Sequence, residues 1–246
     1  MLLEFADITP LKNFFDIIYD TVQIVEMKLD QEKLSISLLN DSHVAFYNLE
    51  ISKGFFIDYI VDGAESVLVF VEDFYKILKS SSKDDMLTMK TTESNLICTF
   101  ERDTGRRVFE LPLAEDYGES PVPPSIDYKG ECVVSLADLK EPVTDLDKIV
   151  KTDRFKIVVS NNTLNVVAPP DSMTRYNLSI NIDDTPDGYV TVNVEYINQL
   201  LKLSKIDKEV TFHYGDGLPL SWNITSYDEL VKVSGLIAPI ISEEDE

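Results

Sequence analysis

The chain has 246 residues, 44% of them hydrophobic, which is enough for two separate hydrophobic cores. It carries 44 acidic and 22 basic residues, so its formal net charge is −22. This composition excludes a disordered chain, argues against a broadly basic nucleic-acid-binding surface and favours solubility or basic partners. A local lysine-rich face can still attract phosphate, because salt screens distant acids beyond about 8 Å.

Cysteine use and hydropathy indicate the compartment. Cys98 and Cys132 are the only cysteines, and each lies among apolar residues. This pattern predicts buried thiols in a reducing compartment, with neither a disulfide nor a metal site. No apolar run reaches the roughly 18 residues of a membrane helix, and the N-terminus lacks a signal-peptide pattern. We therefore expect an intracellular protein that does not associate with membranes.

Periodic segments in the first half predict two helices among strands. Thr9 and Pro10 are typical of a helix start, with Thr9 as N-cap. The helix turns Lys12 away from an apolar face that comprises Leu11, Phe14, Phe15, Ile18 and Val22. Alternation over 34–38 predicts a strand, residues 72–80 form a second amphipathic helix, and strands follow near 96–100 and 107–111.

Three prolines near the middle of the chain mark a linker. Pro121, Pro123 and Pro124 lie in a segment without periodicity, and such a segment cannot occupy the interior of a sheet. We predict a first domain over 1–113, a linker over 114–131, a second domain over 132–240 and an acidic tail over 241–246, which we expect to be disordered.

The second half repeats the order of the first. Strands are predicted at 133–136, 155–159, 164–167, 176–182, 190–194, 210–214 and 220–224, with a helix over 195–203. A helix within 135–149 either starts near Glu141 or bends at Pro142. Residues 71–79 match residues 194–202 at an offset of 123, which favours a duplicated domain. The fold class is α+β with antiparallel sheets.

The usual catalytic motifs are missing from the sequence. It has no phosphate-binding glycine loop, no zinc-protease motif, no nucleophile elbow and no paired CxxC, and His43 and His213 are its only histidines. Both imidazoles fit ordinary strand or loop positions. We therefore expect a non-enzyme with no catalytic residues, no metal and no cofactor.

Several short motifs together resemble one family. Residues 41–44 read Asp-Ser-His-Val, residues 76–79 read Lys-Ile-Leu-Lys, and Ala238-Pro239 precedes an acidic end. With the duplicated halves and the central linker, the whole chain resembles a sliding clamp of the proliferating cell nuclear antigen (PCNA) type. The resemblance implies a ring of three subunits, with antiparallel sheets outside and two helices per domain lining a central hole.

A ring of this kind encircles duplex DNA and gives a DNA polymerase its processivity. The lysines that the resemblance places toward DNA are Lys12, Lys76, Lys79, Lys83, Lys140, Lys148, Lys202 and Lys205. On the residues alone, a solvated helix face explains the lysine stripe of the second helix equally well. The family usually carries basic residues on the first helix of the second domain, whereas this chain has Glu141, Pro142 and Thr144 there, so we expect a thinner positive lining.

The resemblance also implies two protein interfaces. Subunits would join through Arg106, Arg107, Phe109 and Leu111 of one chain and Asp171, Arg175, Tyr176 and Leu178 of the next, although surface ion pairs contribute little. Short peptides of the polymerase, clamp loader, ligase and flap nuclease would bind at Leu39, His43, Phe46, Val122, Asn193, Pro219, Leu236, Ala238 and Pro239. From the residues alone, 236–240 could instead pack the last strand.

Two other classes of function remain open at the sequence level. The net charge of −22 fits an acidic protein that mimics DNA and binds basic partners, and an enzyme without a known motif comes third. Within the clamp reading, a homotrimer and a mixed ring with paralogous subunits are both possible. The protein would be cytoplasmic in an archaeon and nuclear in a eukaryote.

Overall fold

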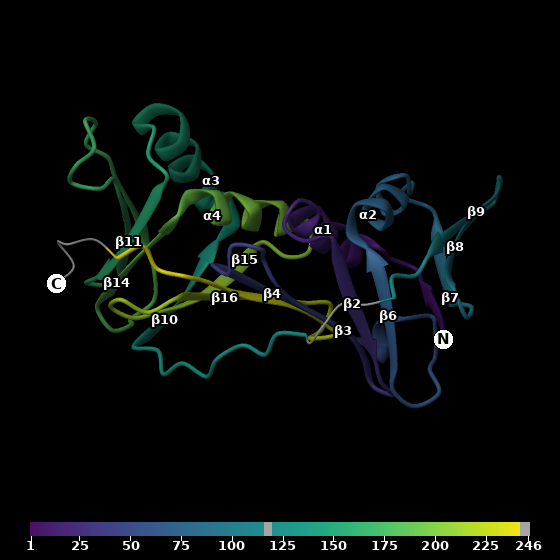
Figure 1. Ribbon diagram of the computed structural model, residues 1–246. Coiled ribbons are helices and arrows are strands. Elements are labelled where there is room, and N and C mark those ends of the chain that lie inside the picture. Colours follow the sequence, from purple (N-terminus) through teal and green to yellow (C-terminus); the bar gives the residue numbers. More distant parts are fainter. Residues whose placement is uncertain (116–119, 242–246) are drawn as a thin grey trace. The chain divides into compact units, whose positions relative to one another are not determined.

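The computed structural model describes residues 1–115 and 120–241, and the chain divides into two compact units (Figure 1). Unit 1 comprises Met1–Asp41, Tyr47–Val122 and Thr225–Val233, and unit 2 comprises Ser42–Phe46, Pro123–Ile224 and the chain from Ser234 onward. Each unit therefore takes a short segment from the other half of the sequence. The predicted domain boundaries stay a prediction, and the predicted acidic tail lies outside the described residues except at residue 241.

Unit 1 is built from nine strands and two α-helices among the described residues. In chain order these are β1 (Leu2–Phe5), α1 (Thr9–Ile18), β2 (Ile24–Leu29), β3 (Lys33–Leu39), β4 (Ala45–Ser52), the 3₁₀ turn η1 (Lys53–Phe55), β5 (Asp58–Ile60), β6 (Glu65–Phe70), α2 (Val71–Lys79), β7 (Met86–Thr91), β8 (Asn95–Arg102) and β9 (Gly105–Pro112). One sheet has the order β5-β1-β7-β8-β9, and β6-β2-β3-β4 are neighbours in another.

Unit 2 repeats this plan, with no counterpart of β5 among its described residues. Its elements are β10 (Gly130–Ser135), α3 (Leu136–Asp145), the π-helical turn η2 (Leu146–Val150), β11 (Arg154–Ser160), β12 (Thr163–Val167), β13 (Asn177–Asn181), β14 (Gly188–Asn193), α4 (Val194–Leu201), the 3₁₀ turn η3 (Lys202–Lys205), β15 (Glu209–Tyr214), β16 (Leu220–Ser226) and β17 (Val231–Ile237). The strand orders are β10-β15-β16-β17 and β14-β11-β12-β13.

The two units have the same topology, which confirms the predicted duplication. β1-β7-β8-β9 corresponds to β10-β15-β16-β17, and β6-β2-β3-β4 corresponds to β14-β11-β12-β13. The elements around the second helix keep the offset of 123 found in the sequence: β6, α2 and β7 begin at Glu65, Val71 and Met86, while β14, α4 and β15 begin at Gly188, Val194 and Glu209. The pairings that β1, β2, β7, β8, β11, β12 and β15 make are antiparallel, as predicted.

Apolar side chains at alternate strand positions and on one face of each helix form the cores. In unit 1, Phe15 of α1 and Phe74 of α2 pack edge to face with their ring centroids 4.8 Å apart. In unit 2, Phe155, Phe212 and Trp222 are fully buried. Burying an aromatic side chain of this size stabilises the fold by about 1.5–3 kcal/mol. The two helices of each unit are neighbours because their apolar faces share one core.

Helix ends differ from the sequence-based predictions in three places. Ile8, not Thr9, is the N-cap of α1, because Asp7 accepts the Thr9 amide hydrogen bond from outside the helix at 2.8 Å. α1 ends at Ile18, so Val22 lies beyond it. α2 ends at Lys79, which leaves Lys83 in the following loop instead of on the helix.

Pro142 does not delay the start of α3. The helix begins at Leu136 because Ser135 caps it, with the Ser135 hydroxyl accepting the Ala137 N–H at 3.2 Å. Pro142 lies inside the helix, where it has no N–H for the carbonyl of Asp138. The α-helix gives way to the π-helical turn four residues later, and Lys151 ends that turn in the left-handed conformation, with φ of 61°.

Candidate nucleic-acid and protein interfaces

The exposed side of the α1–α2 pair in unit 1 carries lysines, acids and tyrosines together. Lys12 donates to the Ser81 hydroxyl at 3.2 Å, and the Lys79 ammonium lies 5.5 Å from the centre of the Tyr75 ring. Tyr75 stacks on Tyr19 at 5.0 Å and donates its hydroxyl hydrogen bond to Asp16. Burial and this carboxylate raise the pKa of Tyr75. The rings and the Asp16 carboxylate therefore hold part of this surface in place.

Two acids on the same helix partly neutralise the positive charge of Lys76. Its ammonium is 2.7 Å from Glu72 and 3.6 Å from Asp73, and the hydrogen bond with Glu72 is the main reason why its pKa is raised. All three side chains are mostly exposed. Pairs of this kind contribute little to stability, but they reduce the positive potential that the helix presents. Lys83 is exposed in the loop after α2.

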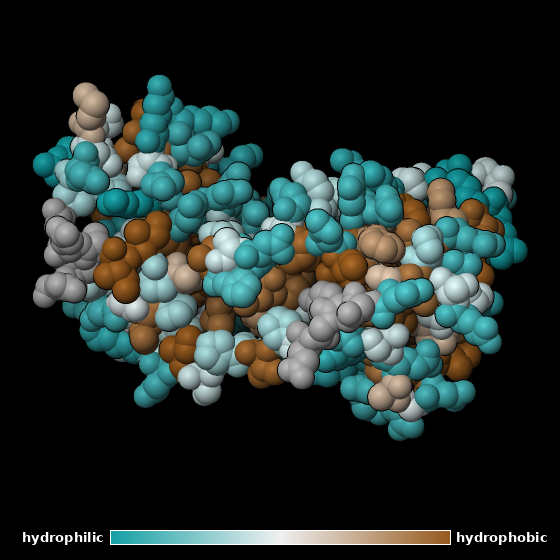
Figure 2. Space-filling model, viewed as in Figure 1, coloured by the Kyte–Doolittle hydropathy of each residue, from teal (hydrophilic) through white to brown (hydrophobic). Residues whose placement is uncertain are grey.

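The predicted DNA-facing lysines of unit 2 lie on its helices and helical turns. Lys140 is exposed on α3, Lys148 is exposed on η2, and Lys202 and Lys205 belong to the 3₁₀ turn after α4. Acids share these elements, namely Asp138, Glu141 and Asp145 on α3, Asp147 on η2 and Glu195 on α4. Figure 2 shows hydrophilic residues gathered over the helices of each unit. Together α3, η2, α4 and η3 carry five acids and four lysines.

β9 forms one edge of the first sheet of unit 1 and carries the first set of predicted interface residues. Arg106 is 3.2 Å from Glu101, and Phe109 packs edge to face on Phe100. Leu111 is buried, which leaves Val108, 50% exposed, as the prominent apolar side chain of the edge. The predicted set omitted Val108.

Arg107 binds within its own chain. Its guanidinium lies 2.5 Å from the carboxylate of Asp85, donates to the Ser80 carbonyl at 3.2 Å and stacks over Phe100 at 5.3 Å. Asp85 is buried and also accepts the Ser82 N–H at 2.8 Å. Sequence reasoning missed Asp85, whose only signal was a serine-rich turn before a strand. The Ser82 hydrogen bond and Arg107 together hold the pKa of Asp85 below its usual range.

The second predicted set lies on and before β13, an edge strand of unit 2. Asp171 is 3.3 Å from Arg154, so this carboxylate already has a basic partner in its own unit. Arg175 is exposed, Tyr176 is half-buried, and Leu178 is one of the half-buried residues of β13. Burial and Asp145 raise the pKa of Tyr176 to about 12. Met173, fully exposed in the same loop, was not predicted.

The predicted peptide-binding residues are distributed over both units. Leu39 and Val122 belong to unit 1, where Leu39 is half-buried and Val122 is 87% exposed. The other seven belong to unit 2: His43, Phe46, Asn193, Pro219, Leu236, Ala238 and Pro239.

Within unit 2, some of these residues are neighbours. The Ala238 amide donates to the Val44 carbonyl at 2.8 Å, which places the C-terminal segment beside the loop that contains His43. Close packing of Gly235 on the Phe46 carbonyl leaves no room for a Cβ atom, which would approach within 2.5 Å. Pro239 lines a cavity of about 190 Å³ with Tyr189. Asn193 lines a separate cavity, of about 460 Å³, and caps α4 by accepting the Glu195 N–H at 2.9 Å.

The two cysteines lie inside the protein. Cys98 and Cys132 are free and buried, as predicted, and burial raises the pKa of both thiols to about 12. Within residues 1–115 and 120–241, no group of three or more His, Cys, Asp and Glu side chains is arranged to hold a metal ion. No helix in the same part of the chain is long and apolar enough to span a membrane.

The Asp85–Arg107 pair generates a prediction about stability. We expect Asp85→Asn to lower the free energy of unfolding at pH 7 by about 1–3 kcal/mol, because a hydrogen-bonded charge is lost and Arg107 keeps no counter-ion. A carboxyl with a depressed pKa stabilises the fold above its unfolded pKa of about 4 and loses this effect as pH falls through the lower folded value. The difference between the two proteins should therefore shrink in acid.

Urea unfolding from pH 7 to pH 3 measures this effect, with Asp84→Asn as the matched control. Asp84 is the exposed neighbour, so its substitution should change stability by less than about 0.5 kcal/mol. Equal stability of the two variants at pH 7 would contradict the role of Asp85.

Comparison with known proteins agrees with this architecture. Residues 1–114 match the family model for the N-terminal domain of proliferating cell nuclear antigen. The DNA polymerase sliding clamp of Methanothermobacter thermautotrophicus is 28% identical over 245 residues, and that of Methanobrevibacter smithii is 27% identical over 245 residues. Each alignment covers 98% of this chain and 98% of the relative.

Solved structures show the same fold. The crystal structure of the PCNA2–PCNA3 complex from Sulfolobus tokodaii matches with a TM-score of 0.87 at 20% identity, covering 97% of this chain and 99% of the other. PCNA from Thermococcus kodakaraensis gives the same TM-score, identity and coverage. The family model, the full-length relatives and the solved structures together show that the chain resembles PCNA-type sliding clamps.

Proposed function

We propose that this chain is a subunit of a ring that slides on duplex DNA, confers processivity on a DNA polymerase and recruits replication and repair proteins. The main support is the duplicated clamp fold over the full length of relatives named as DNA polymerase sliding clamps. A closed ring stays on DNA by encirclement, so its contacts with phosphate can be weak. The near balance of acids and bases on the helices is compatible with such contacts.

Pairing of two strand edges would close the ring. β9 and β13 are edge strands on different units, and each carries an exposed apolar residue on or near it, Val108 and Met173 respectively. An edge strand that pairs with another chain satisfies its open N–H and C=O groups. Because the two edges differ, the contact is head to tail and closes when the rotation per subunit is right. Three subunits would give six similar units around the ring.

The subunits need not be identical. The similar structure from Sulfolobus tokodaii is a complex of two differently numbered clamp proteins. The β9 edge of this chain could therefore pair with β13 of the same protein or of a paralogue.

Absolute mass in solution tests assembly. At micromolar concentration, light scattering after size exclusion should give about three times 27.9 kDa for a homotrimer. Val108→Glu should reduce the mass to that of a monomer, because it places unpaired charge at the joint. Val133→Glu is the matched control, since Val133 is 52% exposed on a different edge strand, β10, and the variant should keep the mass.

A monomer that assembles only when paralogous subunits are added would support the mixed ring. A monomer under all these conditions would contradict the ring and favour the acidic mimic, which should bind DNA-binding proteins in competition with DNA.

The lysines on and beside the helices should determine how a loaded ring responds to salt. We expect the triple variant Lys79→Ala, Lys83→Ala, Lys205→Ala to support polymerase extension on a primed circular template poorly, with the difference from the unaltered protein largest at low salt and shrinking as salt rises. Removing three cations weakens attraction to phosphate and also the salt dependence of direct DNA binding. The control is Lys28→Ala, Lys90→Ala, Lys232→Ala, which removes three exposed lysines on strands. Equal activity of the two triple variants would refute a DNA-facing role for these helices.

The C-terminal segment of unit 2 is our candidate for peptide recruitment. Its support is the apolar surface at Leu236, Ala238 and Pro239 beside the loop that contains His43, where half-buried side chains can contribute to a groove. Fluorescence polarisation with labelled short peptides from the polymerase and ligase of the same organism measures binding. Ala238→Asp should weaken binding at least tenfold, whereas Ile149→Asp, at another exposed apolar position of unit 2, should not change it. Similar affinities of both variants would exclude this segment.

A further inference from the structure

Within residues 1–115 and 120–241, no strand covers the outer edge of β10 in unit 2, whereas β5 covers the equivalent edge in unit 1. In unit 1, β5 pairs with β1 through Leu2 and Ile60, Leu3 and Tyr59, and Glu4 and Asp58. Among the described residues of unit 2, only β15 pairs with β10. The difference has a simple origin: the connection from β4 to β6 runs over residues 53–64, whereas the one from β13 to β14 runs only over 182–187.

The strand register shows which backbone groups face this open edge. The Leu136 N–H donates to the Lys208 carbonyl at 2.8 Å, so alternate residues from Gly130 to Val134 direct their N–H and C=O groups toward β15. Glu131, Val133 and Ser135 therefore direct theirs outward. The Glu131 carbonyl already accepts a hydrogen bond from the Thr185 hydroxyl at 2.7 Å. Val133, 52% exposed, is the centre of the uncovered part.

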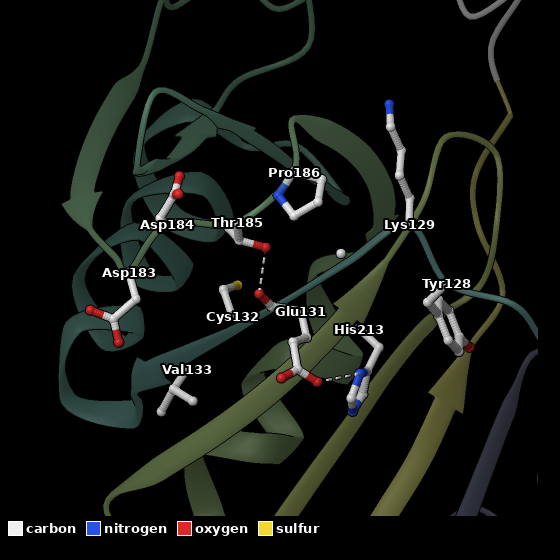
Figure 3. Close-up of a pocket in the computed structure, with 11 residues that line it drawn as sticks. Tyr128, Lys129, Glu131, Cys132, Val133, Asp183, Asp184, Thr185, Pro186 and His213 are labelled. Carbon is white, nitrogen blue, oxygen red and sulfur yellow. Dashed lines mark hydrogen bonds and ion pairs between the residues drawn. The ribbon is translucent and has the colours of Figure 1, made fainter.

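A preformed pocket of about 440 Å³ lies at this edge (Figure 3). Its loop is held by the Thr185 contact and by the Tyr214 hydroxyl, which donates to the Pro186 carbonyl at 2.8 Å. Tyr214 can pack against residue 130 because this residue is a glycine: a Cβ atom there would lie only 2.7 Å from the Tyr214 phenol oxygen. The loop thus fixes one wall of the pocket without covering Val133.

The charges around the pocket favour a basic occupant. Glu131, Asp183 and Asp184 line it, and the Glu131 carboxylate lies 3.4 Å from the ring of His213. Lys129 also lines the pocket, but its ammonium is 3.2 Å from Asp216, which is not a lining residue. In Figure 3 the Lys129 side chain points away from Glu131. Carboxylates beside an open strand edge suit lysine or arginine side chains on an added strand.

We propose that the edge of β10 is a docking site for an extended segment of a partner protein that carries lysine or arginine at alternate positions and adds to the sheet as an antiparallel strand. The partner residues opposite Val133 and Ser135 exchange backbone hydrogen bonds with them, whereas the residue opposite Glu131 accepts only from the Glu131 N–H, because Thr185 occupies the Glu131 carbonyl. The basic side chains of the partner lie on the same face as Glu131. The partner residues between the basic ones are apolar, and their side chains lie on the same face of the sheet as Cys132 and Val134. The site belongs to unit 2 alone and requires no ring.

The probe is the blocked peptide Lys-Val-Lys-Val-Lys, titrated into the intact protein by calorimetry at low and moderate salt. Saturable binding is expected, and the triple variant Glu131→Gln, Asp183→Asn, Asp184→Asn should weaken it at least tenfold. The matched control is Asp84→Asn, Glu93→Gln, Asp103→Asn, which removes the same charge from exposed positions of unit 1 and should leave the affinity within twofold. Thermal unfolding of both triple variants verifies that they fold.

Backbone methylation of the peptide separates strand addition from general charge attraction. N-methylation of the central lysine removes the donor that pairs with Val133 and should abolish at least nine-tenths of the affinity. N-methylation of the first valine alters an N–H that points away from β10 and should have little effect. On binding, the Val133 amide should exchange hydrogen more slowly.

Equal affinity of the two methylated peptides, or of the two triple variants, would overturn the proposal and show only attraction to an acidic surface. Absence of saturation at millimolar peptide would overturn it as well.

Discussion

Strand edges impose the constraint on which the rest of this structure depends. Every backbone N–H and C=O needs a partner, and an antiparallel sheet leaves these groups open at its outer strands. In unit 1 the short strand β5 covers one edge of the first sheet, and β9 forms the other. In unit 2 the described residues leave β10 and β13 as outer strands. The proposed subunit contacts and the proposed docking site are both answers to this constraint.

Duplication makes the differences between the units informative. The corresponding sheets share their strand order, so an element present in one unit and missing from the described part of the other marks a separate adaptation. The strand β5, which has no counterpart among the described residues of unit 2, is one example. Pro142 in α3 is another, because α1 has its proline near its start. Neither change disturbs the core, since the buried faces of the helices and strands are retained.

Electrostatics in this protein are local. The net charge of −22 does not describe any single face, because acids and lysines alternate along the same helices. Lys76 with Glu72 and Arg107 with Asp85 illustrate two outcomes of such pairing. The first pair is exposed and lowers the positive potential of a helix, whereas the second contains a buried carboxylate and fastens β9 to the loop before β7. Basic residues named together from the sequence thus have different roles.

The sequence by itself determined the helices, most strands and the duplication, because periodic burial and a repeated offset are local signals. The burial of Cys98 and Cys132 also followed from their apolar neighbours. Tertiary structure alone decided that Arg107 binds Asp85 and that the edge of β10 is open. Each depends on residues far apart in the chain or on the length of a connection, and no local pattern encodes which groups a folded chain will bring together.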